Sequence, residues 1–463
     1  MPTPQLDPRD PESRIARLLD DGKFEFLIPR TDCGMVAVTG DIKGNKVVVF
    51  ASDATIKSGA LGVEGSKVIV TAYKAAMGAQ VPIIGIWHSG GARLSDGVAS
   101  LDAFGEVFQS MISASGRIPQ LSLVLGPTAG GGAYGPALTD IVVLSPEGRI
   151  FVTGPDVVKS VTGEDIDMAL LGGPEAHKKN SGLAHIIAPT EQEAIDDIRD
   201  LTALFANQGF MSADVEDIDL SAFVPESKIR TYEVHPLIDA LLDKETEHIE
   251  LLSMWAPNMT TIIGRLGGAT VGVLANNPAH IAGVLDAAAG EKAARFVRTC
   301  DAFGIPLIVI ADVQGFLPGA GQEWEGAVRR GAKLLHAFGE AVIPRVTLIT
   351  RRAYGGAYVA MNSKALGATR VFAWPQAEVS VMGAVAAVRV LHRRILADLP
   401  VEQRESMELE LAAEHEKVSG GVARAVEIGA VDEIVEPKLT RSALAKVIAD
   451  APHRRGAHGN IPL

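Results

Sequence analysis

The sequence is poor in cysteine, in aromatic residues and in long apolar runs, and each shortage excludes a class of protein. Two cysteines, Cys33 and Cys300, occur without a CxxC pair, which excludes a zinc ribbon and argues against a disulfide framework. Aromatic residues are 5% of the 463 residues, too few for a surface that stacks on nucleic acid bases. No apolar run approaches the roughly 20 residues of a membrane helix, and the N-terminus lacks the pattern of a signal peptide. We therefore expect a cytosolic enzyme or enzyme subunit.

The charge balance is acidic. The chain has 43 Lys and Arg against 56 Asp and Glu, a net charge of −13, which argues against a nucleic acid as its main partner. An anionic small ligand would then need local basic groups and backbone N–H donors. The apolar content of 47% allows a sizeable core.

A glycine-rich stretch, Gly126–Tyr134, follows the apolar run Leu121–Leu125, which we predict to be a buried strand. Glycines at a strand end bring backbone N–H groups close to a ligand, because no Cβ atom intervenes. If a helix begins there, its unpaired N–H groups favour a phosphate or a developing oxyanion. A tight turn with close helix–strand packing is the structural alternative.

The stretch occurs twice, which indicates an internal duplication. The matches are Pro82 with Pro306, Pro119 with Pro344, and Gly131–Tyr134 with Gly355–Tyr358, at separations of 224, 225 and 224 residues. We predict one domain over residues 1–225 and a second over 226–463, with an acidic linker near 214–228. Strands and helices alternate in both halves, so the fold class is α/β, and the glycine turns fall at strand ends where such sheets bind ligands.

The sequence contains no recognisable catalytic or metal-binding motif made of side chains. His88, Ser89 and Asp96 lie close together, but a G-x-S-x-G elbow is missing, so a hydrolase triad is not expected. The histidines lack metal-ligand spacing, and no P-loop or dinucleotide fingerprint occurs.

The charged clusters give little further indication of a catalytic or binding site. Glu164, Asp165 and Asp167 are best explained as solvated loop acids. A solvated face is the commoner explanation for the helical series Lys292–Arg298, whereas Arg93, beside a glycine turn, is the better candidate for a phosphate contact. What remains is duplicated backbone donors without an obvious catalytic side chain, a pattern that suits chemistry through an enolate.

Motifs along almost the whole chain resemble the carboxyltransferase (β) subunit of biotin-dependent acyl-CoA carboxylases. They are Val63–Gly65, Ser89–Arg93, Gly126–Tyr134, Val152–Pro155, Gly172–Pro174, Ala275–Pro278, Lys292–Arg298 and Val381–Ala384. The short length is most like that of actinobacterial acetyl-/propionyl-CoA carboxylase β subunits, which supply malonyl-CoA for fatty and mycolic acid synthesis. The resemblance implies two crotonase-like ββα-spiral domains and a ring-shaped hexamer. The N-terminal half of one subunit would face the C-terminal half of another.

The resemblance also implies roles for residues, with acyl-CoA on the N-terminal half and biotin on the C-terminal half. The oxyanion sites map onto Gly130 with Gly131 and onto Gly383 with Ala384, and the motifs leave open which one holds the thioester oxygen. Substrate-binding residues would be Ser89, Gly90, Gly91, Ala92, Arg93, Gly154 and Val385. Residues on the biotin side would be Gly355, Gly356, Ala357 and Tyr358.

In the family's mechanism carboxybiotin releases CO2, the biotin enolate takes the α-proton, and the CoA enolate attacks CO2. No protein base and no metal ion are required. A biotinylation motif and an ATP-grasp domain are both missing, so the resemblance implies a partner α subunit with biotin carboxylase and biotin carboxyl carrier functions.

Two departures from the family pattern affect the functional prediction. Gln314 stands where many relatives have proline, and Val385-Ala386 stand where a polar residue and glycine are common, beside the presumed acyl pocket. Two alternatives therefore stay open: a decarboxylase of the same fold, and a non-catalytic β subunit of a mixed carboxylase complex.

Overall fold

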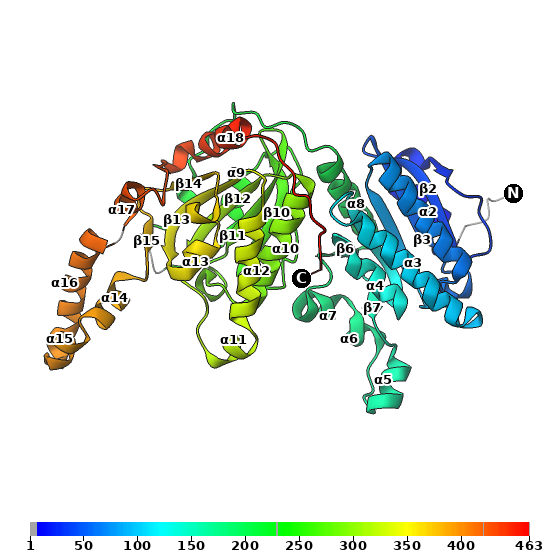
Figure 1. Cartoon of the computed structure of the whole chain (residues 1–463), viewed down its shortest axis with the longest axis horizontal. Coiled ribbons are helices and arrows are strands. Elements are labelled where there is room, and N and C mark those ends of the chain that lie inside the picture. Colours follow the sequence, from blue (N-terminus) through cyan, green and yellow to red (C-terminus); the bar gives the residue numbers. More distant parts are fainter. Residues whose placement is uncertain (1–6, 228–229, 420, 463) are drawn as a thin grey trace. The chain divides into compact units, whose positions relative to one another are not determined.

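The computed structural model describes residues 7–227, 230–419 and 421–462, which form two compact units (Figure 1). Unit 1 contains the residues up to Gln208 together with Ile249–Trp255 and Ala457–Pro462. Unit 2 contains Gly209–His248 and Ala256–Gly456. Residues 214–227 of the expected linker therefore belong to unit 2, and Lys228 lies outside the described residues.

The sheet of unit 1 is mostly parallel. Its strands follow the order β1 (Phe24–Phe26), β2 (Met35–Ile42), β3 (Asn45–Ser52), β4 (Ile83–Ser89), β5 (Gln120–Ala129), β6 (Ile141–Leu144) and β8 (Ile186–Ile187), and β7 (Arg149–Phe151) pairs with the end of β5. The pairs β1–β2 and β2–β3 are antiparallel, and the pairs from β3 onward are parallel. The carboxyl ends of the parallel strands therefore share one edge, where α/β sheets bind ligands.

The sheet of unit 2 repeats this arrangement. It contains β10 (Met259–Leu266), β11 (Ala269–Asn276), β12 (Leu307–Val313), β13 (Arg345–Tyr354), β14 (Arg370–Ala373) and β16 (Glu433–Ile434), and β15 (Glu378–Ser380) pairs with the end of β13. The pair β10–β11 is antiparallel, and the pairs from β11 to β16 are parallel.

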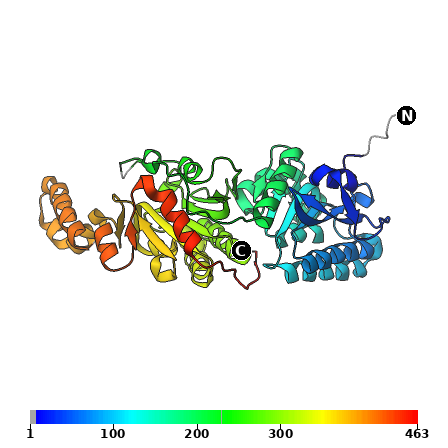
Figure 2. The same cartoon turned by 90° about the horizontal axis from the view of Figure 1, so that it is seen from above.

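Helices cover both faces of the unit 1 sheet. They are α1 (Pro11–Leu18), α2 (Val63–Ala79), α3 (Val98–Ala114), α4 (Gly131–Leu138), α5 (Pro155–Thr162), α6 (Met168–Gly172), α7 (Pro174–Ala176) and α8 (Glu191–Ala206). Figure 2 shows α2 and α3 side by side, and they bury Tyr73 and Phe104 in one core with Phe50 and Trp87 of the sheet. The predicted helix over 191–206 is confirmed.

Unit 2 contains a larger set of helices. They are α9 (His235–Leu241), α10 (Ala287–Phe303), α11 (Ala320–Trp324), α12 (Ala327–Glu340), α13 (Gly355–Ala360), α14 (Ala384–Leu391), α15 (Arg393–Asp398), α16 (Val401–Ser419), α17 (Val422–Glu427) and α18 (Thr440–Asp450). In Figure 1, α14–α16 extend away from the rest of unit 2, where Val388, Leu396 and Ala412 form a small core of their own.

Helix α10 overturns one expectation. It packs against both α12 and β10, so its residues are buried nearly all round. Lys292 and Arg295 are 1% and 8% exposed, and the solvated face expected for them is wrong. Lys292 Nζ donates to the carbonyl oxygen of Ala256 at 3.4 Å, and Arg298 pairs with Glu340. These cations are structural groups of unit 2.

The duplication is visible in backbone conformation. Strands β5 and β13 each span ten residues, and each is followed by a glycine with positive φ, Gly130 at 58° and Gly355 at 57°. These equivalent glycines are 225 residues apart, so the sequence match of Gly131 with Gly355 is shifted by one residue. Three residues after β7 and β15, Gly154 and Gly383 precede α5 and α14 in the same way.

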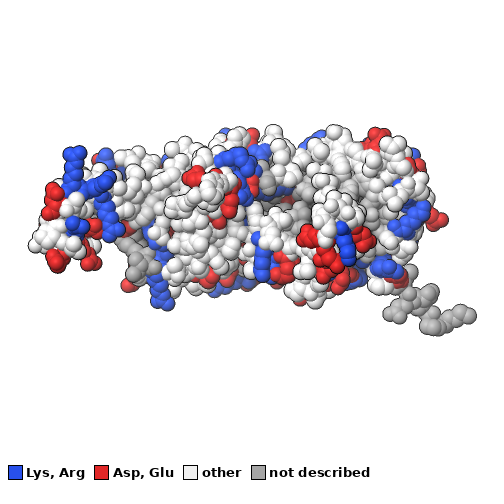
Figure 3. Space-filling view, turned by 90° about the horizontal axis from the view of Figure 1, so that it is seen from below, with Lys and Arg blue, Asp and Glu red and all other residues white. Residues whose placement is uncertain are grey.

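On the face shown in Figure 3, basic and acidic side chains are interspersed among uncharged ones, without the continuous basic band that a polyanion would need. Among the described residues, no helix is both long and apolar enough to cross a membrane.

Candidate active site

The first glycine loop joins β5 to α4. The Gly130 N–H donates to the carbonyl oxygen of Phe151 at 3.2 Å, and Ala133 N–H donates to that of Gly130 at 3.1 Å. The intervening N–H groups of Gly131 and Gly132 have no hydrogen-bond partner among the described residues, as expected for the first turn of a helix. A Cβ atom at Gly131 would lie 3.2 Å from ring carbons of Phe104. A larger residue there would therefore press on Phe104, and the loop leaves two N–H groups for a ligand oxygen.

The turn Ser89–Arg93 adjoins this loop. The Ser89 hydroxyl accepts the Gly91 N–H at 3.2 Å, and a Cβ atom at Gly132 would lie 3.1 Å from the same oxygen. Gly90 N–H donates to the Ser58 carbonyl, whereas Ala92 N–H has no partner in the described part of the chain. The Ala92 N–H is therefore a third available backbone donor, in addition to those of Gly131 and Gly132.

Arg93 has a structural role in the chain. Its Nη2 donates to the carbonyl oxygens of Cys33 at 2.7 Å and Ala60 at 3.3 Å, which ties the turn to the segment before α2. Nη2 is thus committed to the backbone, whereas Nε is buried and has no hydrogen-bond partner among the described residues.

The equivalent region of unit 2 holds two sets of N–H groups. Neither set has a hydrogen-bond partner among the described residues. One set lies at the start of α13 and consists of Gly355, Gly356 and Ala357; the other lies at the start of α14 and consists of Gly383 and Ala384. A cavity of about 270 Å³ adjoins α14, and its lining includes Tyr354, Glu378, Ser380, Met382, Ala384 and His415.

Two other expected site residues point into their own unit. The Tyr358 hydroxyl donates to the carbonyl oxygen of Ala430 at 3.2 Å, and burial raises the pKa of this phenol. Val385 packs against the core of α14–α16, and Gln314 lies exposed after β12.

The two units differ at two equivalent positions, a signal that the sequence contains but that motif matching missed. Pro155 begins α5 and has no N–H, whereas Ala384 begins α14 and has one. Ala92 and Phe316 make equivalent strand bridges, to Leu61 and Leu285. The Phe316 ring lies 3.9 Å from the Cβ position of Gly356, whereas in unit 1 the ring beside the equivalent Gly131 belongs to Phe104, at 3.2 Å. Each unit thus offers a different donor set.

A hydrolase triad does not form. His88 Nδ1 lies 3.4 Å from Arg14 Nη1, and Asp96 accepts the Val63 N–H at 3.2 Å, so neither side chain serves Ser89. Asp165 pairs with Lys159, and Asp167 caps α6. Within the described ranges, no three His, Cys, Asp or Glu side chains gather as a metal ion would need.

Comparison with known proteins now identifies the family. The family model for the carboxyl transferase domain matches residues 13–456. The chain belongs to the carboxyl transferase domain family. It is 57% identical over 461 residues to the biotin-dependent acetyl-/propionyl-coenzyme A carboxylase beta6 subunit of Mycobacterium bovis, covering 99% of this chain and 98% of that protein. It is 51% identical to the propionyl-CoA carboxylase beta chain of Rhodococcus erythropolis, covering 99% and 97%.

Solved structures agree with the family assignment. The transcarboxylase 12S structure, described as a hexamer with methylmalonyl-coenzyme A bound, superposes with a TM-score of 0.90 at 34% identity, covering 98% of this chain and 92% of that one. The resemblance inferred from the motifs and the duplicated crotonase-like α/β fold are both confirmed.

Proposed function

We propose that this chain is the carboxyltransferase (β) subunit of a biotin-dependent acyl-CoA carboxylase. It would transfer a carboxyl group to the α carbon of acetyl-CoA and propionyl-CoA, giving malonyl-CoA and methylmalonyl-CoA for fatty acid and mycolic acid synthesis in the cytosol. Full-length similarity to β subunits named for these two substrates supports the substrate class. The transcarboxylase 12S structure, with methylmalonyl-coenzyme A bound, supports the reaction type.

The observation that carries this function is the presence of unpaired backbone N–H groups at equivalent strand ends of both units. Removing a proton from the α carbon of a thioester places negative charge on the carbonyl oxygen. Preorganised N–H donors stabilise such an oxyanion and need no rearrangement during the reaction. The loops contain no histidine or carboxylate positioned as a base within the described residues, which fits chemistry whose base arrives with a cofactor.

The difference between the units suggests which oxygen each one binds. In unit 1, Ala92, Gly131 and Gly132 supply three donors at adjoining turns, and we assign the thioester oxygen to them. In unit 2, Gly383 and Ala384 supply a pair of donors at the start of α14, and Ala384 lines a cavity. We assign the ureido oxygen of biotin to that pair. The acyl-CoA side would then be residues 1–225 and the biotin side residues 226–463.

The cavity beside α14 offers polar and apolar contacts for a bicyclic group, because its lining combines Tyr354 and Met382 with the polar side chains of Glu378, Ser380 and His415. When bound, biotin supplies the carboxyl group and the base. The residues of this chain orient the ureido group and the thioester and stabilise their negative charge. Biotin would be carried by a partner α subunit, and a homohexamer, as described for transcarboxylase 12S, would be the working assembly.

The test is bicarbonate fixation by the purified chain mixed with a biotinylated α subunit, comparing acetyl-, propionyl- and butyryl-CoA. Fixation into the two short thioesters, lost in Gly131→Val, is expected. Gly78→Ala is the matched control, because no atom lies within 4 Å of its Cβ position. A stable complex that fixes bicarbonate into none of the three would contradict the proposal and favour a non-catalytic subunit.

A further inference from the structure

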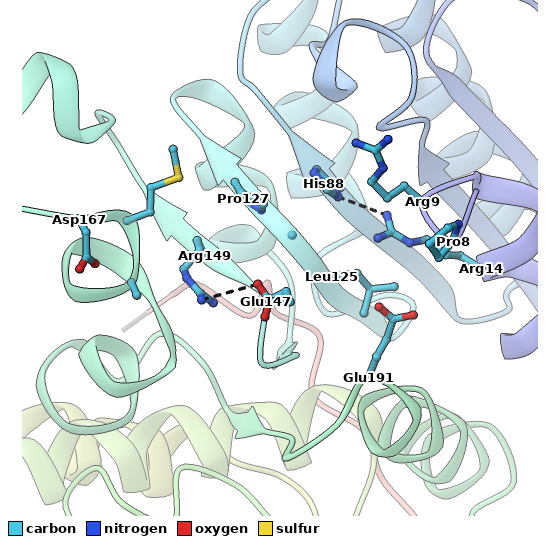
Figure 4. A pocket seen from close by; sticks show the side chains of 13 residues that line it. Pro8, Arg9, Arg14, His88, Leu125, Pro127, Glu147, Arg149, Asp167 and Glu191 are labelled. Atoms are coloured by element: carbon cyan, nitrogen blue, oxygen red, sulfur yellow. Dashed lines mark hydrogen bonds and ion pairs between the residues drawn. The ribbon is translucent and has the colours of Figure 1, made fainter.

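A further cavity, about 570 Å³ in volume, belongs to unit 1 and lies on the face of the sheet opposite α4 (Figure 4). Adjacent residues of a strand point to opposite faces. Ser89 faces α4, because it lies beside Gly132, whereas the His88 ring lies against Gly126 and near Arg14 of α1. The cavity is therefore separate from the glycine-loop donors assigned to the thioester.

A buried positive charge that is bonded to no described carboxylate lines this cavity. Arg14 is 3% exposed, forms no ion pair with a described carboxylate, and its Nε has no hydrogen-bond partner among the described residues. Figure 4 shows its guanidinium directed at His88, whose Nδ1 accepts from Nη1 at 3.4 Å. Burial, then Arg14 and Arg9, lower the pKa of His88 to about 4, so the ring is neutral near pH 7. Arg9 itself pairs with Asp7 at 2.8 Å.

Three carboxylates also line the cavity, but each has another partner. Glu191 pairs with Arg17, and Glu147 lies 3.9 Å from Arg149, which also donates to two backbone carbonyls. Asp167 accepts a backbone N–H as the N-cap of α6. The buried arginine of α1 is therefore bonded to no carboxylate, and Glu191 and Asp7 act on its charge only at longer range, an arrangement that costs free energy unless a ligand supplies a closer counter-charge.

The duplication provides an internal comparison for this position. Ile83 pairs with Gln120 in unit 1 as Leu307 pairs with Arg345 in unit 2. His88 is therefore equivalent to Asp312, and Gly126–Pro127 are equivalent to Arg351–Arg352.

The equivalent site of unit 2 is occupied by its own side chains, and its two arginines share one bonded carboxylate. Asp312 accepts from Arg351 Nε at 2.8 Å and from Arg352 Nε at 3.1 Å, and all three side chains are buried. The Arg351 guanidinium also stacks on the Tyr232 ring, 4.6 Å from its centroid. In unit 1 the strand contributes glycine and proline instead, so the same place is a cavity with an arginine and no acid bonded to it.

We propose that the unit 1 cavity binds a small molecule that carries a carboxylate or phosphate group on an apolar body. The anionic group would bind Arg14, because a guanidinium presents parallel donors that match both oxyanions. The apolar part would contact Leu125, Pro127 and Met168, which also line the cavity. The volume lies within the usual range of small-molecule sites.

The test is calorimetric titration of the full chain in its native assembly with hexanoate, hexyl phosphate and neutral hexanol. Arg14→Met removes the charge at similar volume. Ala169→Trp fills the cavity from an exposed position on α6. Lys23→Met, which removes an exposed cation of the same unit, is the matched control. Thermal melting and carboxyl transfer report whether each variant folds.

We expect one of the two anions to bind with a Kd of roughly 1 mM or tighter. The stronger of hexanoate and hexyl phosphate identifies the anionic group. Arg14→Met and Ala169→Trp should weaken this binding by about tenfold or more, and Lys23→Met should not. Hexanol should show no dependence on Arg14. Equal binding to wild type and a folded Arg14→Met variant, no binding of either anion, or complete displacement by free coenzyme A would each overturn the proposal.

Discussion

Replacing Ala384 by proline should remove one backbone donor of the proposed biotin site and little else. Ala384 is the first residue of α14, where the helix itself does not use the N–H and where proline is favoured. Gly383 has φ −57° and ψ 141°, a conformation that a following proline accepts. Unit 1 already has Pro155 at the equivalent position. The free energy of unfolding should therefore change by less than about 1 kcal/mol.

The rate of carboxyl transfer should nevertheless fall. Loss of one oxyanion donor lowers kcat by about 10²–10³, which corresponds to about 2.7–4 kcal/mol in the activation barrier. The assay is steady-state malonyl-CoA formation with a biotinylated α subunit, accompanied by thermal melting and measurement of the assembly size.

Two variants control for this experiment. Gly383→Ala keeps both N–H groups, and its new Cβ atom would lie 3.6 Å from Tyr354 Cε2, an ordinary contact, so most activity should remain. Pro155→Ala adds an N–H in unit 1 and should leave kcat nearly unchanged. If a folded, assembled Ala384→Pro variant keeps kcat within about threefold of wild type, the N–H of residue 384 donates to no charge that develops in the reaction.

The remaining predictions concern the glycine loop and the buried charges. Gly131→Val should abolish carboxyl transfer, because its side chain would collide with Phe104; turnover of the purified variant measures this, and wild-type kcat would contradict it. Asp312→Asn should lower the free energy of urea unfolding by about 3–5 kcal/mol, since the two buried arginines bonded to it lose their counter-charge; a loss below about 1 kcal/mol would refute this. The pKa of His88 is lowered to about 4 in the folded protein, so the folded state binds this proton less readily than the unfolded state does. The contribution of His88 to the free energy of unfolding is therefore fully present above about pH 6.5 and is lost as the pH falls toward 4. His88→Asn should flatten this pH dependence by about 1–2 kcal/mol, allowing for partial solvent exposure, and an unchanged slope would show that other groups cause it.

Local pattern predicted most of the architecture. The apolar strand runs and the helix over 191–206 were predictable because periodicity reports which residues face a core. The separation of about 225 residues between repeats predicted two related units, since the proline and glycine positions recur at strand ends.

Expectations that depended on the surroundings of a residue were less successful. The series Lys292–Arg298 has the spacing of a solvated face, yet α12 and the sheet bury its first two cations. The glycine motifs suggested pairing Gly131 with Gly355, whereas the positive φ angles pair Gly130 with Gly355. Identical residues in two repeats do not determine the residue at which a strand ends.

The sequence by itself determined the fold class, the duplication and the glycine loops, because these follow from local periodicity and from the conformations that only glycine adopts easily. Only the tertiary structure decided which N–H groups stay unpaired, since their partners come from distant segments. It also decided that His88 lies beside Arg14 whereas the equivalent Asp312 binds two arginines. These residues are far apart in the chain, and the packing of α1 and the sheet strands sets their distances and their charges.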